Sequence, residues 1–154
     1  MHTLPRNHTL IAAVALSGAL AFIAGCAPMS PMAPASGTMS TQTYALSGSF
    51  EVPPVTTTAT GSATVTINPD RSVKATVTVN SMTATASHIH EGAAGANGPV
   101  IVPFTKTGDN TFAAPADAKL TEAQYASYKA GNLYVNVHSS KNPGGEVRAQ
   151  IKGN

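Results

Sequence analysis

Apolar and polar side chains alternate with a period of two along most of the chain after residue 44. Two of these runs, residues 64–68 and 73–79, are separated by Asn-Pro-Asp-Arg at residues 68–71. A proline at the second position of such a tetrapeptide favours a tight turn, so the segment predicts a β-hairpin. Because successive side chains of a strand point to opposite faces, the pattern restricts the chain to a sheet with one buried face.

Four further segments are expected to be strands, three by the same alternation and one, residues 100–102, as a short apolar run. Residues 44–52 and 100–102 supply two of them, the second bounded by prolines. Residues 133–138 and 146–152 supply two more, joined by Asn-Pro-Gly-Gly at residues 142–145. About seven or eight short strands with tight turns predict an all-β protein, an antiparallel Greek-key-like β-sandwich.

One short helix is expected among the strands. Thr121 and Gln124 have the spacing of a capping box, in which each side chain bonds the backbone of the other residue. Gly131 follows at a position where a left-handed residue can end a helix. We therefore predict a helix that begins after Thr121 and runs to about Ala130.

The start of the chain has the character of an export signal. Arg6 precedes an apolar run at residues 10–24, which is too short to span a bilayer. The run ends in Ile-Ala-Gly-Cys, and Cys26 is the only cysteine of the chain. This ending resembles the bacterial lipobox, in which the cysteine becomes the lipidated first residue of the mature protein. The resemblance implies export and a membrane anchor on Cys26, and Ala27 in place of aspartate favours the outer membrane in a Gram-negative cell.

These features divide the chain into three parts. Residues 1–25 are the predicted lipoprotein signal peptide. Residues 26–43 are the predicted flexible tether, which is rich in proline and small residues and contains no charged residue. Residues 44–154 are the predicted β-sandwich domain, which is long enough to bury one core.

The composition excludes several classes of protein. Nine basic and seven acidic residues give a net charge of +2, without any run of lysine or arginine, which argues against a nucleic-acid partner. No cysteine follows Cys26, so the domain has neither a disulfide nor a thiolate nucleophile, and no Gly-x-Ser-x-Gly motif occurs. Neither familiar nucleophile arrangement is therefore visible in the sequence.

Three histidines form the sharpest local feature. His88 and His90 lie on one expected strand, so both imidazoles face the same way while Ile89 enters the core. His138 occupies the polar phase of a later strand. If the two strands are neighbours, three imidazoles converge on a metal ion, and imidazole suits Zn, Cu, Fe or Ni. The alternative is that the three histidines are unconnected surface residues.

A second possible site consists of charged residues. Glu51 and Glu146 are candidate paired carboxylates, although nothing in the sequence brings them together. Glu146 and Arg148 share a face of the last expected strand, which predicts a surface ion pair worth under about 1 kcal/mol. Within residues 44–52, Phe50 falls on the apolar phase and Glu51 on the polar phase.

Five segments resemble the CHRD domain family, which is named for repeats in chordin and also occurs alone in bacterial exported proteins. They are Glu-Val-Pro-Pro-Val at 51–55, His-Ile-His-Glu-Gly at 88–92, Asn-Gly-Pro at 97–99, Gly-Asn-Leu-Tyr-Val-Asn-Val-His at 131–138 and Asn-Pro-Gly-Gly-Glu-Val-Arg at 142–148. Two positions depart from the family pattern, since Ala149 and Glu91 stand where glycine or a small residue is usual. The resemblance covers roughly residues 44–151 and implies a β-sandwich that acts as a binding module.

The His-Ile-His segment and the glycine-rich loop after it also resemble the copper-ligand strand of copper-zinc superoxide dismutases. This weaker resemblance implies a copper site made of His88, His90 and His138, with zinc less suited. The cysteine pair and the zinc-binding loop of those enzymes do not occur in this sequence.

Two hypotheses follow for the function. The first is a non-catalytic binding module, lipid-anchored in the cell envelope, whose protein partner the sequence does not identify. The second is a copper-binding or zinc-binding protein that uses the three histidines, with superoxide dismutase-like activity as a further option.

Overall fold

A computed structural model describes residues 40–153; the predicted signal peptide, Cys26 and most of the predicted tether lie outside these residues. The described part consists of short strands, one turn of 3-10 helix and one α-helix. In chain order these elements are β1 (Thr41–Ser47), η1 (Gly48–Phe50), β2 (Thr60–Ile67), β3 (Val73–Asn80), β4 (Ala84–Glu91), β5 (Val100–Pro103), β6 (Thr105–Gly108), β7 (Thr111–Ala113), α1 (Glu122–Lys129), β8 (Leu133–Ser139) and β9 (Val147–Ile151).

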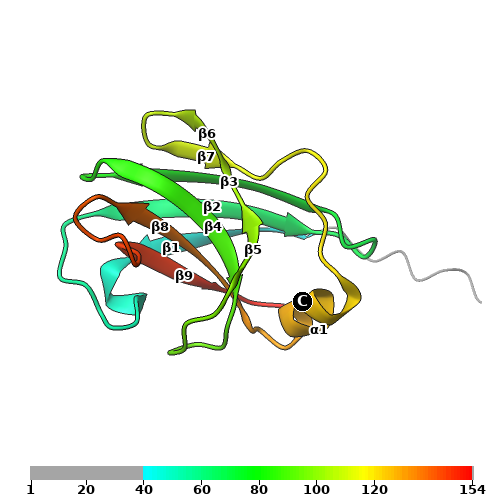
Figure 1. Ribbon diagram of the computed structural model, residues 1–154. Coiled ribbons are helices and arrows are strands. Elements are labelled where there is room, and N and C mark those ends of the chain that lie inside the picture. Colours follow the sequence, from blue (N-terminus) through cyan, green and yellow to red (C-terminus); the bar gives the residue numbers. More distant parts are fainter. Residues whose placement is uncertain (1–39, 154) are drawn as a thin grey trace, which may run out of the picture. The chain divides into compact units, whose positions relative to one another are not determined.

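The nine described strands belong to one antiparallel sheet, in the order β5-β4-β8-β9-β1-β2-β3-β7-β6 (Figure 1). Strands β1 and β9 pair at a single position, Ser47 with Arg148, so the sheet divides there into two halves. Buried apolar side chains from both halves form one core cluster. The prediction of an all-β, sandwich-like fold is confirmed, with nine strands where seven or eight were expected.

The predicted hairpin is confirmed as strands β2 and β3, which pair without interruption from Thr60–Asn80 to Ile67–Val73. Alternate residues of β3 are buried, as the period-two pattern requires. On the other half of the sheet, Ile89 of β4 is fully buried in the same core. Each such side chain stabilises the fold by about 1.5–3 kcal/mol relative to an exposed position.

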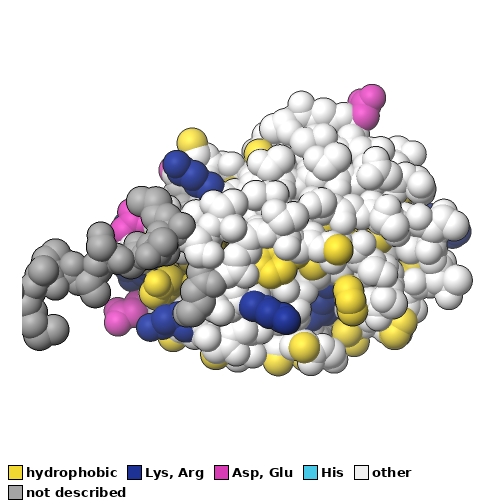
Figure 2. Space-filling view, turned by 180° about the vertical axis from the view of Figure 1, so that it is seen from behind, with side chains coloured by type: hydrophobic (Ala, Val, Ile, Leu, Met, Phe, Trp, Pro, Cys, Tyr) yellow, Lys and Arg dark blue, Asp and Glu magenta, His cyan; other side chains and the backbone are white. Residues whose placement is uncertain are grey.

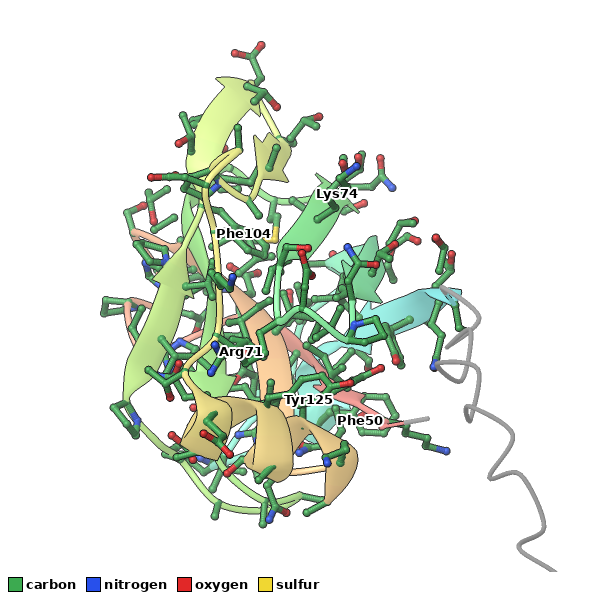
Figure 3. All side chains as sticks on the ribbon, turned by 90° about the vertical axis from the view of Figure 1, so that its right-hand side faces the viewer. Phe50, Arg71, Lys74, Phe104 and Tyr125 are labelled. Carbon is green, nitrogen blue, oxygen red and sulfur yellow. The ribbon has the colours of Figure 1, made fainter. Side chains whose placement is uncertain are left out.

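The first predicted strand ends earlier than the sequence indicated. Strand β1 stops at Ser47, whose hydroxyl caps the 3-10 turn η1 by accepting from the backbone N–H of Ser49. The turn inverts the alternation, so Phe50 is 58% exposed and stands beside β9 (Figure 3), whereas Glu51 is only 5% exposed. The expectation that Phe50 is buried and Glu51 exposed is therefore wrong. The alternation of strand β1 does not continue through the 3-10 turn, because the backbone changes direction there.

The predicted helix is confirmed as α1. Thr121 is its N-cap, and both hydrogen bonds of the capping box with Gln124 are present. Gly131 follows the helix with a φ of 75°, the left-handed conformation that favours glycine. Among residues 40–153, no helix is long and apolar enough to cross a membrane.

Candidate metal centre

The three histidines, His88, His90 and His138, lie on one face of strands β4 and β8, which are neighbours in the sheet. Ile89 and Val137 are fully buried in the core, so the imidazoles occupy the opposite face. One nitrogen atom of each ring lies within 4.8 Å of those of the other two. The structure therefore brings the three rings together in one cluster, as expected for neighbouring strands.

Backbone carbonyls determine which nitrogen atom of His90 and of His138 carries the proton and which keeps a lone pair. The Nδ1 atom of His90 lies 2.9 Å from the carbonyl oxygen of Gly98, and that of His138 lies 2.9 Å from the carbonyl oxygen of Pro143. A carbonyl only accepts, so both Nδ1 atoms donate and both Nε2 atoms keep a lone pair. A carbonyl on the outer nitrogen is also what orients histidine ligands in metal sites.

The third ring presents its other nitrogen to the cluster. The Nδ1 atom of His88 lies 3.0 Å from the Nε2 atom of His138. Because that Nε2 atom carries a lone pair, the Nδ1 atom of His88 donates the hydrogen bond between them. When the proton of His88 moves to its own Nε2 atom, the ring offers Nδ1 as a third nitrogen ligand.

Burial keeps the three rings uncharged. Burial, together with smaller contributions from repulsion by His138 and His90, lowers the pKa of His88 to about 4. Burial also lowers the pKa of His90 and of His138, against the raising effect of their backbone carbonyls. The imidazoles are therefore neutral at pH 7, the form that coordinates a metal.

Arg148 holds the loop of residues 92–99 over this face of the sheet. Its guanidinium, 1% exposed, donates to the carbonyl oxygens of Ala96 at 2.9 Å and Ala93 at 3.3 Å. It also donates to the side-chain oxygen of Asn97 at 3.3 Å. The loop therefore depends on a buried cation from β9.

The same cation belongs to a stack that ends at the histidine cluster. The guanidinium carbon of Arg148 lies 3.4 Å from the centre of the Tyr134 ring. The ring of His90 stacks on Tyr134, with centroids 4.7 Å apart and planes 6° apart. The Tyr134 hydroxyl accepts from the backbone N–H of Gly98, whose carbonyl holds His90. Arg148, Tyr134 and Gly98 thus position one ring of the cluster.

Replacing Gly98 with alanine is expected to disturb that ring. A side chain at Gly98 would overlap the carbonyl oxygen of Glu91, a backbone atom that has no freedom to move aside. We expect a loss of about 2 kcal/mol of unfolding free energy, measured by urea denaturation, and weaker metal binding through the displaced carbonyl of Gly98. Gly144→Ala is the matched control, because nothing lies within 4 Å of its added atom. Equal urea midpoints for the two variants would contradict this expectation.

A buried carboxyl group adjoins the cluster through Asn136. Glu51 is 5% exposed, and burial raises its pKa to about 7, although Arg148 and Asn136 act in the opposite direction. A side-chain atom at Gly145 would lie 2.5 Å from Oε1 of Glu51 and 2.7 Å from Nδ2 of Asn136, so glycine leaves room for both. Asn136 lies directly opposite His88 in the pairing of β4 with β8.

The raised pKa of Glu51 predicts a pH-dependent gain for Glu51→Gln. The folded-state pKa of about 7 exceeds the usual 4.5, so the carboxyl contributes stability below pH 4.5 that is lost as the pH rises through 7. Glutamine stays neutral and avoids this loss. The variant should match the parent at pH 4.5 and exceed it by about 2 kcal/mol at pH 8 in chemical denaturation. A difference that does not change with pH would show that the buried carboxyl does not titrate in this range.

The second acidic residue lies elsewhere. Glu146 accepts hydrogen bonds from the hydroxyls of Ser139 and Thr57. The guanidinium of Arg148 bonds the loop carbonyls instead, so the expected surface ion pair with Glu146 does not form. The reason is that Arg148 is buried by a loop whose path the strand pattern does not reveal.

Sequence reasoning missed three residues that shape the site. Asn136 and Tyr134 share the polar phase of their strand with His138, which predicts that they face outward, but each is only 2% exposed. Gly98 was treated only as part of a loop. One signal in the sequence could have revealed them. The polar residues of the strand that carries His88 and His90 are followed by a glycine-rich segment, residues 92–99, that is long enough to fold back over the strand.

A cavity of about 760 Å³ is lined in part by Glu51 and Arg148. Phe50, Val52 and Pro54 are among its apolar lining residues, and none of the three histidines lines it. The face opposite to that of Figure 1 shows apolar side chains beside several lysine and arginine side chains, and no histidine is in view there (Figure 2). The histidines therefore do not line this cavity, although Glu51 and Arg148 adjoin both.

Comparison with known proteins gives one match. A family model described as the CHRD domain matches residues 42–151, which extends from β1 to the last residue of β9. Neither the curated proteins nor the solved structures contain a match to the chain.

Proposed function

The chain belongs to the CHRD domain family, and on that premise we propose that it is a metal-binding module of the bacterial cell envelope. The proposed ion is copper, held by the Nδ1 atom of His88 and the Nε2 atoms of His90 and His138. The proposed role is binding of the metal, and lipid on Cys26 is proposed to attach the domain to the membrane.

One observation carries the metal proposal. The Nε2 atom of His90 is buried and has no hydrogen-bond partner, while its Nδ1 atom is engaged by Gly98. A buried lone pair without a donor costs free energy, which a metal ion bound there would recover. The Nε2 atom of His138 faces the same point, so the cluster has the donor set of a three-nitrogen site with open positions.

The donor set favours copper over the other divalent ions. It contains three neutral imidazoles and neither a carboxylate nor a thiolate, which suits a borderline ion and gives calcium or magnesium no oxygen ligand. Among first-row divalent ions, nitrogen sites bind Cu²⁺ most tightly. Zinc is the competitor, since it also accepts three imidazoles and a fourth ligand.

Electron paramagnetic resonance of the Cu²⁺-loaded protein tests the ligand set. We expect one copper per chain with hyperfine coupling to three imidazole nitrogens, and slow displacement by a tenfold excess of zinc. The full chain with Cys26→Ser is the appropriate sample, because a free thiol is itself a copper ligand. A spectrum with one or two coupled nitrogens would contradict the three-histidine site.

The anchor proposal rests on the sequence around Cys26 alone. The parent chain, expressed in a bacterium, should incorporate a radiolabelled fatty acid and fractionate with membranes. Cys26→Ser should remove both the label and the membrane association while the metal site is unaffected. Membrane association that persists without the cysteine would contradict the lipid anchor.

A further inference from the structure

Three buried polar atoms beside the metal centre have no hydrogen-bond partner at good geometry. They are Oε1 of Glu51, Oδ1 of Asn136 and Nε2 of His90, in side chains that are 5%, 2% and 8% exposed. All three are acceptors when His90 is neutral and Glu51 is ionised. Buried acceptors that lack a donor are rare in native proteins, so their grouping here indicates a ligand that supplies hydrogen atoms or positive charge.

The orientation of the Asn136 amide follows from its neighbours. Its Nδ2 group and Oε1 of Glu51 both lie next to Gly145, and a hydrogen bond from Asn136 lowers the pKa of Glu51. Only the NH₂ side of the amide can act in this way, so Nδ2 faces Glu51. The Oδ1 atom then faces His90, where a weak hydrogen bond to Asn136 raises the pKa of His90 against the larger lowering effect of burial.

A bound metal ion would give the Nε2 atom of His90 a partner, and a ligand on that ion would give the Oδ1 atom of Asn136 a partner. An ion held by the three rings binds the lone pair of His90 directly. Asn136 is not one of the three nitrogen ligands, but it lies opposite His88 in the pairing of β4 with β8, so its side chain occupies the same face of the sheet as the three rings. A water molecule bound to the ion has acidic hydrogen atoms that an amide oxygen accepts well.

We propose that the metal keeps a fourth position facing Asn136, and that this position selects a small ligand with hydrogen atoms to donate, such as water or hydroperoxide, over an anion without them. Asn136 accepts the hydrogen bond of that ligand, and Glu51 is the positioning residue that keeps the amide oxygen turned toward the metal. This inference rests on the proposed three-histidine metal site.

Azide binding to the Cu²⁺-loaded full chain with Cys26→Ser tests the selectivity. Azide has no hydrogen atom to donate, so it must displace the water against the amide oxygen of Asn136. In Asn136→Leu the water loses its acceptor, and azide affinity, read from the charge-transfer band, should rise about tenfold, which corresponds to one hydrogen bond. Copper stoichiometry, measured in parallel, should remain one per chain.

Two variants of Glu51 distinguish the orientation of the Asn136 amide from the charge of the Glu51 carboxylate, and neither variant alters Asn136 itself. Glu51→Gln removes the negative charge but keeps an oxygen that accepts from Nδ2, so its azide affinity should stay within twofold of the parent. Glu51→Leu frees the amide to turn, and azide affinity should rise by several-fold. Equal increases in the two variants would show an effect of charge and overturn the role of Glu51.

The outcomes distinguish this inference from the function on which it rests. A parent chain that does not bind copper overturns both. A parent that binds copper through three imidazoles, with an azide affinity that Asn136→Leu and Glu51→Leu leave unchanged, overturns the fourth position and leaves the metal site standing.

Discussion

Replacing His90 with alanine is expected to abolish copper binding while the domain stays folded. His90 supplies a buried Nε2 atom that has no other partner, and its ring is held by Gly98 and by stacking on Tyr134. Removal of the ring leaves only two imidazole ligands. We therefore expect the copper dissociation constant to rise at least about a hundredfold, which is a loss of roughly 2.7 kcal/mol of binding free energy. Isothermal calorimetry at pH 7 measures the change.

The control for this variant is Thr76→Ala, which removes an exposed polar side chain from β3, a strand of the other half of the sheet. Its copper affinity should equal that of the parent. Circular dichroism of both variants should show the parent's β-sheet spectrum. An unchanged copper affinity in a folded His90→Ala protein would eliminate the site.

Replacing Arg148 with methionine is expected to have the largest effect on stability. Methionine keeps an unbranched apolar side chain but removes the donors to Ala93, Ala96 and Asn97. It also removes the positive charge that lowers the pKa of Glu51. Breaking a buried charged group of this kind typically costs 3–5 kcal/mol, so we expect a loss of about 3 kcal/mol in urea unfolding at pH 7.

The loop of residues 92–99 should respond as well. Amide hydrogen exchange in the loop is expected to accelerate in Arg148→Met, because the guanidinium no longer bonds its carbonyls. The matched control is Lys74→Met, which removes an exposed cation of β3. A loss below about 1 kcal/mol for Arg148→Met would indicate that the buried cation and its partners contribute little net free energy.

The strands and the shared face of the histidines were predictable because they depend on local periodicity. In β3 every second residue is buried, and the same parity places Ile89 in the core and the flanking His88 and His90 on the other face. The capping box of α1 was readable for the same reason, since Thr121 and Gln124 interact across a fixed short spacing. Such features require no knowledge of distant contacts.

The neighbourhood of the cluster depends on contacts that no local pattern encodes. Asn97 donates from its side chain to the carbonyl of Val52, and Arg148 reaches Ala96, a separation of 52 residues along the chain. These long-range contacts turn a strand face that looks solvent-exposed into a buried polar layer. Glu51 joins that layer only because the 3-10 turn at Gly48–Phe50 reverses the alternation of the segment before it.

Copper titration of the full chain with Cys26→Ser, beside the same chain with His88, His90 and His138 all replaced by alanine, tests the metal-binding account most directly. We expect the first protein to bind one Cu²⁺ with micromolar or tighter affinity and the triple variant to bind none at the same concentrations. Both should show the same β-sheet circular dichroism spectrum. Equal binding by the two folded proteins, or no binding by the first, would contradict the account.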